Sequence, residues 1–131
     1  MSTATEKFNK KYTEVVKIIE KNFADLKAVG KMLISSPRSI ANYLAKIPYG
    51  TEKSVKLMRR ELAENANADN KCPLTCGIFL RIAIEASIEQ SNGAKPDLPF
   101  WRVIDKNSSI TQKLPIAEKY LTDLRTSEGL Q

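Results

Sequence analysis

Apolar residues recur at three- and four-residue steps along most of the first ninety positions, which is the periodicity of amphipathic helices. The first run predicts a helix over residues 6–26 that ends at Gly30. A second helix is predicted to begin with Ser36 as its cap and Pro37 at its first position, and to stop before the turn at 48–50. The N-terminal half is therefore predicted to be helical.

Two further helices are predicted around a polar turn at residues 64–71. The first begins at Thr51 or Ser54, and the second runs from Pro73 to about Ser91. The second is so apolar that only a narrow polar stripe remains, so we expect it to be the central, most buried helix. Asn92 and the glycine after it favour the left-handed conformation that ends a helix. Two helices joined in this way are typical of a helix-turn-helix unit.

The segment at 99–104, Pro-Phe-Trp-Arg-Val-Ile, favours an extended strand, because aromatic and β-branched residues are enriched in strands. A polar turn at 105–109 and a second short strand at 110–111 would complete a hairpin, and a last helix is predicted at 116–125. We therefore predict a mainly α, winged helix-turn-helix-like single domain with a small β-hairpin. It would comprise residues 31–131, with an amphipathic helix within residues 1–30 packed on it.

The formal net charge of +6 is unevenly distributed. Residues 1–60 hold 13 Lys and Arg against 5 Asp and Glu, whereas residues 61–131 hold 8 against 10. The densest basic patch comprises four cations, which are Lys53, Lys56, Arg59 and Arg60. Such a patch is suited to contacting phosphate, but an ordinary solvated face is the alternative.

The chain contains no histidine, which removes the commonest general base and metal ligand. Cys72 and Cys76 have neither redox nor zinc spacing, so we expect reduced thiols, no metal and no cofactor. Cys72, at a helix start, is the one candidate nucleophile, and a small buried thiol is the alternative. With no membrane-length apolar run and no signal sequence, we expect a cytoplasmic protein without a membrane partner.

Several short motifs occur together in a recognisable order. They are Ile-Pro-Tyr-Gly-Thr at 47–51, Cys-Pro-Leu-Thr-Cys-Gly-Ile-Phe at 72–79, Asn92, Pro-Phe-Trp-Arg-Val-Ile at 99–104 and Glu-Gly at 128–129. In this order the chain resembles the carboxy-terminal domain of O6-alkylguanine-DNA alkyltransferases. It is most similar to a bacterial alkyltransferase-like branch, whose Lys-Met-x-Ile-x-x-Pro-Arg element is matched at 31–38.

The resemblance implies a helix-turn-helix that enters the DNA minor groove, with an arginine that takes the place of a flipped base. Phe100 and Trp101 occupy the positions of the family's nucleophilic cysteine and its histidine, so alkyl transfer at this position is excluded. The family's phosphate-contacting tyrosine corresponds to Val55. Its arginine corresponds to Ala83, or to Arg81 if the alignment shifts.

Two functions remain open at this stage. One is a non-enzymatic DNA-binding protein, a monomer on double-stranded DNA that recognises alkylated guanine for repair. The other is a repurposed winged-helix scaffold that binds a protein or a small molecule. The residues expected to contact DNA are Lys53, Ser54, Lys56, Arg59, Arg60, Arg81 and Arg102. The pocket is expected to comprise Asn92, Phe100, Trp101 and Arg102, although the two aromatics could equally be core residues.

Overall fold

The fold is given by a computed structural model that describes residues 3–10, 12, 15–19, 30–34, 36–66, 68, 70–71, 73–92 and 94–130. This part of the chain is mainly α. Its α-helices are α1 (Ala4–Asn9), α2 (Pro37–Ala45), α3 (Val55–Asn65), α4 (Pro73–Ser91) and α5 (Glu118–Thr126). Its strands are β1 (Val15–Ile19), β2 (Gly30–Ile34) and β3 (Asn70–Lys71), and two 3₁₀ helices, η1 (Phe100–Arg102) and η2 (Ser109–Lys113), precede α5.

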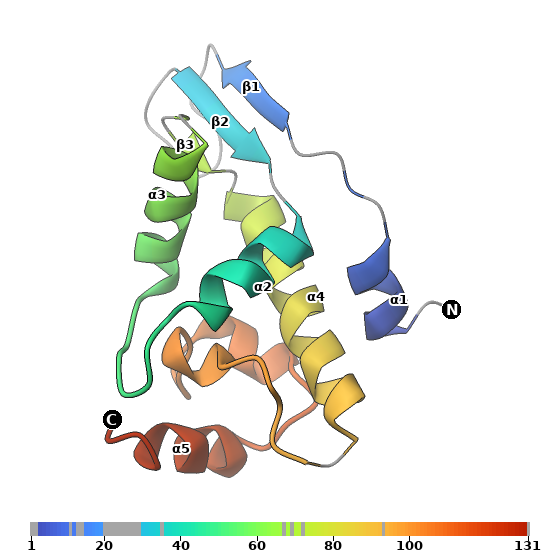
Figure 1. The fold of residues 1–131 in the computed structure, drawn as a ribbon, viewed down its shortest axis with the longest axis vertical. Helices are drawn as coiled ribbons and strands as arrows, with labels where there is room; N and C mark the ends of the chain where they lie inside the picture. Colours follow the sequence, from blue (N-terminus) through green and yellow to red (C-terminus); the bar gives the residue numbers. More distant parts are fainter. Residues whose placement is uncertain are drawn as a thin grey trace.

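The helices α2, α3 and α4 form the middle of the molecule, with the sheet at one end and α5 at the other (Figure 1). The sheet has the order β1-β2-β3. The pair β1 and β2 is antiparallel, with Val15 opposite Ile34, and β2 and β3 are parallel, with Met32 opposite Asn70. No helix among the described residues is both long and apolar enough to cross a bilayer.

The predicted helix over residues 6–26 is wrong in its extent. The helix α1 ends at Asn9, Lys10 has an extended backbone conformation, and Val15–Ile19 pairs as a strand. Four of the five residues of β1 are β-branched, and such residues favour strands when a neighbouring strand is present to pair with them. Gly30 starts β2 instead of ending a helix. Residues 20–29 lie outside the described residues.

The predicted starts of α2 and α3 are confirmed. The Ser36 hydroxyl accepts a hydrogen bond from the Ser39 amide at 3.2 Å, and Pro37 takes the first helical position. The Ser54 hydroxyl accepts one from the Leu57 amide at 3.0 Å. Each cap satisfies an amide that has no partner within its own helix.

The helix α4 is the centre of the hydrophobic core, as predicted, and packs against α1 and α2. Its fully buried residues include Cys76, Leu80 and Ile84. Ile78 is an exception to the expected burial of this helix, because 56% of it is exposed. Asn92 follows the helix with a φ of 50°, in the left-handed region that was predicted to end it.

The predicted β-hairpin is wrong, because its two segments fold as the 3₁₀ helices η1 and η2. Consecutive side chains of a strand point to opposite faces, whereas Phe100 and Trp101 are both buried, at 0% and 2% exposure. A short helical turn places both rings inside the core. They meet edge to face, with ring centroids 5.3 Å apart.

Replacing Ser54 with alanine is expected to destabilise the protein by about 1 kcal/mol, because the Leu57 amide would lose its acceptor. Ser54→Gly is expected to destabilise the protein by only about a few tenths of a kcal/mol, because glycine is well tolerated at this position. Urea unfolding followed by circular dichroism measures both. Equal losses for the two variants would contradict a capping role.

Candidate functional site

The carboxylate of Glu128, just after α5, is the centre of a buried polar network. The Arg102 guanidinium donates to both of its oxygens, from Nε at 2.8 Å and from Nη2 at 2.9 Å. The Trp101 indole donates to Oε2 at 2.7 Å, and the Gly50 amide donates to Oε1 at 2.8 Å. The Glu128 side chain is 0% exposed, so these bonds replace water at the carboxylate.

Arg102 is held from several sides by the fold. In addition to Glu128, its Nη1 donates to the Ile47 carbonyl at 2.7 Å, and its own carbonyl accepts from the Lys53 amide at 2.9 Å. Gly50 has a φ of 76°, which glycine adopts without strain, and this conformation presents its amide to the carboxylate. Arg102 therefore joins η1 to the turn that precedes α3.

A second arginine, the buried Arg125 of α5, fixes the other side of η1. Its Nη1 donates to the carbonyls of Trp101 and Ile104, at 2.7 and 3.1 Å, and its Nη2 lies 3.1 Å from Glu52 Oε2. No feature of the sequence predicts the role of Arg125, because no spacing distinguishes it from an exposed helical arginine. The position of Glu128 in the Glu-Gly motif likewise does not predict that it is buried.

In the part of the chain that the structure describes, Asn92, Phe100, Trp101 and Arg102 do not come together around one pocket as predicted. Both aromatics are core residues, and Arg102 is bound to Glu128. Asn92 is exposed at the end of α4. These residues are thus brought into the core and onto a helix terminus instead of around a shared cavity.

The residues that were predicted to contact DNA are only partly available to a ligand. Lys53 pairs with Glu61 at 3.1 Å, and Arg81 pairs with Glu85 at 2.6 Å. Ser54 caps α3, and Arg59 is half-buried. Lys56 and Arg60 are exposed, and neither is within salt-bridge distance of an acid in the described part of the chain, although the charge of Arg60 contributes to lowering the pKa of Glu61.

The Glu61 carboxylate is shared between Lys53 and Tyr43, whose hydroxyl donates to it at 2.7 Å. The hydrogen bond from Tyr43, followed by that from Lys53, lowers the pKa of Glu61. Burial, and then the bond to Glu61, raises the pKa of Tyr43. The Lys53 ammonium also lies 5.4 Å from the centre of the Tyr43 ring. The contacts of Lys53 with Glu61 of α3 and Tyr43 of α2 therefore hold these two helices together.

A groove of about 490 Å³, here called the α3–α4 groove, lies between the start of α3, one side of α4 and the segment 103–113. Ser54 and Val55 line it from α3, and Ile78 and Arg81 line it from α4. Ser108, Ile110 and Lys113 are among the residues that line it from the last segment. Ala83, which the unshifted alignment put in the arginine position, is buried and lies outside this groove, whereas Arg81 lines it.

Nucleophiles and metal ligands are scarce in the described residues. Cys72, the candidate nucleophile, lies outside them, and Cys76 is fully buried in the core. No cluster of three or more Cys, Asp, Glu or His side chains that could hold a metal occurs in this part of the chain. The groove instead combines apolar side chains with hydroxyls and charges at its edge, which suits binding.

Comparison with known proteins finds no match to any family model, to any curated protein or to any solved structure.

The Glu128 network makes stability depend on acid pH. The two hydrogen bonds from Arg102 are the largest cause that lowers the pKa of Glu128 from 4.5 to about 2; burial opposes them, and Gly50 and Trp101 add to them. A carboxyl whose folded-state pKa is depressed stabilises the fold fully above its unfolded pKa, and loses this contribution as pH falls through the folded value. We expect wild-type stability to fall by up to about 3 kcal/mol between pH 5 and pH 2 from this group.

Glu128→Gln is expected to flatten this dependence and to lower stability at pH 7 by about 3 kcal/mol or more, because Arg102 keeps a half-buried charge without its partner. Urea unfolding at a series of pH values measures both effects. Thr126→Ala, an exposed neighbour at the end of α5, is the control for perturbing this segment. A variant with the wild-type slope between pH 5 and pH 2 would refute the assignment.

Proposed function

We propose that the protein is a non-enzymatic DNA-binding protein of the alkyltransferase-like type, which recognises alkylated guanine for repair in the α3–α4 groove. The observation that supports it best is the composition of this groove. Arg81, the start of α3 and the segment after Arg102 come together around one cavity. By the resemblance, with the alignment shifted, Arg81 is the arginine that takes the place of a flipped base, so a cavity beside it is a suitable place to receive that base. A cytoplasmic monomer acting on double-stranded DNA is part of the proposal.

In this proposal, residues 31–131 form a winged helix-turn-helix-like domain in which η1 and η2 stand where a hairpin would form the wing. The helices α3 and α4 make the helix pair, and the loop-rich segment 103–113 closes the groove beside them. The segment keeps the place of a wing in chain order. Within it, residues 109–113 form the 3₁₀ helix η2 instead of a strand.

The groove has suitable walls for an extrahelical base. Its volume falls in the usual range for small-molecule sites, about 300–1,000 Å³. Val55, Ile78 and Ile110 offer apolar surface against which a base could stack, and the Ser54 hydroxyl lies at the start of α3. Arg81 would have to leave Glu85, but an exposed helical pair of this kind contributes only about 0.3–0.5 kcal/mol.

Lys56 and Arg60 are the best placed cations for the phosphate backbone. They are exposed on α3, which contributes Ser54 and Val55 to the groove. Phosphate contacts position a protein on DNA and supply salt-dependent affinity, whereas contacts in the groove would supply the preference for the lesion. Phe100 occupies the nucleophile position and is buried, so the proposed function is recognition without alkyl transfer.

A repurposed scaffold that binds a protein or a small molecule is the second candidate. It is favoured by the charges of the groove, where Arg81 and Lys113 are balanced by Glu52 and Asp105. Ile78 is also unusually exposed for an apolar residue of this central helix. Such a lining suits a neutral, partly apolar ligand.

Fluorescence anisotropy with duplexes that contain O6-methylguanine or guanine tests the proposal. The wild type is expected to prefer the lesion at low salt, and Arg81→Ala is expected to reduce this preference at least tenfold. The double variant Lys56→Ala, Arg60→Ala is expected to weaken both duplexes alike and to lower the salt slope by about 2, because two phosphate contacts are lost. Lys119→Ala, exposed on α5, is the control cation.

Binding weaker than micromolar at low salt, with no preference for the lesion, would reject the DNA-binding proposal. The scaffold alternative has its own expectation in cells. Reversing the charge of Lys56 and Arg60 would then leave cellular function unchanged, whereas a DNA-binding protein would lose it.

A further inference from the structure

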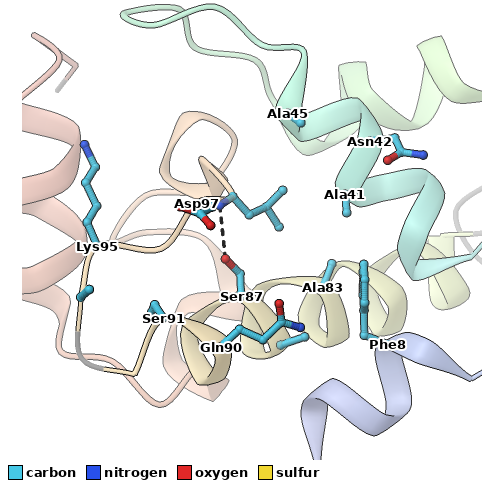
Figure 2. A pocket seen from close by; sticks show the side chains of 13 residues that line it. Phe8, Ala41, Asn42, Ala45, Ala83, Ser87, Gln90, Ser91, Lys95 and Asp97 are labelled. Atoms are coloured by element: carbon cyan, nitrogen blue, oxygen red, sulfur yellow. Dashed lines mark hydrogen bonds between the residues drawn. The ribbon is translucent and has the colours of Figure 1, made fainter.

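A second cavity, here called the α2–α4 slot, has a volume of about 480 Å³ and shares no lining residue with the α3–α4 groove. Ala41 and Ala45 of α2 line one side of it, and Ala83 of α4 lines the other (Figure 2). Phe8 of α1 stands at one end, and the loop that follows α4 forms the other end around Asp97 (Figure 2). Small side chains on two facing helices leave the space open for a flat group.

The loop end of the slot is held in place by the protein itself. The Leu98 amide donates to the Ser87 hydroxyl at 3.3 Å, as the dashed line in Figure 2 shows. Lys95, although its stem lines the slot, extends away from it, and its ammonium lies 5.1 Å from the centre of the Trp101 ring. The Asp97 carboxylate is therefore the charged group that remains at this end.

Three polar side chains at the open side of the slot are exposed to solvent and available to a ligand. Among the described residues, the Asp97 carboxylate and the carboxamides of Gln90 and Asn42 have no hydrogen-bond or ion-pair partner. A carboxylate only accepts hydrogen bonds and can receive two parallel N–H donors, while a carboxamide both donates and accepts. A ligand that binds the Asp97 carboxylate must carry hydrogen-bond donors, and two parallel N–H groups along one edge match its two oxygens, while a carboxamide accepts either kind of partner.

We propose that the α2–α4 slot binds a planar heterocycle with N–H donors on one edge, of the kind found in purine nucleosides. The ring would lie between the alanine walls and against Phe8, with its N–H edge toward Asp97 and a further polar atom toward Gln90. This site is separate from the proposed DNA-binding groove and does not depend on it.

The helix α1 carries the Phe8 end of the slot and packs on α4. It has no buried residue, and it is tied to the domain at exposed positions. The amides of Ala4 and Thr5 each donate to the Glu89 carboxylate at 3.2 Å, and the Arg38 guanidinium lies 4.9 Å from the centre of the Phe8 ring. A ring bound against Phe8 would add buried contact to this helix and so strengthen its docking on α4.

Guanosine, inosine and adenosine are suitable probes for isothermal titration with the full chain. Guanosine presents two adjacent N–H groups on one edge, inosine presents one, and adenosine presents an amino group beside an acceptor nitrogen. We expect affinity to fall in this order, by about fivefold or more at each step. Equal affinity for the three nucleosides, or no binding of guanosine at millimolar concentration, would overturn the proposal.

Asp97→Asn is expected to weaken guanosine binding at least tenfold, and Glu118→Gln, which removes an exposed carboxylate from α5, is expected to leave it unchanged. Ala45→Leu fills the slot from the exposed end of α2 and is expected to abolish binding of all three nucleosides. Ala117→Leu, at an exposed position before α5, is the size-matched control. Thermal unfolding of each variant shows whether it is folded.

Arg81→Ala separates this proposal from the DNA-binding one. It is expected to reduce the preference for alkylated DNA while leaving guanosine affinity unchanged. Loss of guanosine binding in Arg81→Ala but not in Asp97→Asn would place the nucleoside in the α3–α4 groove, and the slot proposal would be rejected. Nuclear magnetic resonance shifts confined to α1, α2 and α4 on addition of guanosine would support the slot.

Discussion

The buried carboxylate of Glu128 holds together segments that are far apart in the sequence. It binds Arg102 and Trp101 of η1 and the amide of Gly50, and so connects the end of α5 to the turn before α3. A carboxylate without exposed surface is costly unless its oxygens accept several hydrogen bonds from a cation and other donors. Because these donors come from two segments and the carboxylate comes from a third, the position of each segment depends on the other two.

This network determines which residues remain for function. Trp101 and Arg102 are used by the core, and Phe100 is buried beside them, so a motif that contains two aromatics and a cation contributes structure instead of a binding surface. By fixing η1, the network also fixes the segment 103–113 that lines the α3–α4 groove. The surfaces that remain accessible to a ligand are therefore those of the helices around the core.

The same reasoning explains how far the fold could be predicted. The starts of α2 and α3 follow from local bonds, since Ser36 and Ser54 cap amides three residues ahead. The N-terminal helix and the hairpin were wrong because their outcome depends on distant partners. Val15–Ile19 pairs with β2, and the aromatics of η1 enter a core built by other helices. The intrinsic helix or strand propensity of a segment is a weak guide where contacts with distant segments determine its secondary structure.

By itself, the sequence determined the mainly helical class, the capped helices and the central position of α4, because each depends on residues within a few positions of one another. It also excluded histidine chemistry. Only the tertiary structure decided that Lys53 belongs to Glu61 and Arg102 to Glu128, whereas Lys56 and Arg60 face solvent. The sequence is the same whether a charged side chain is solvated, paired with an acid or bound to a phosphate. Which of these partners it has depends on the groups that the fold places beside it.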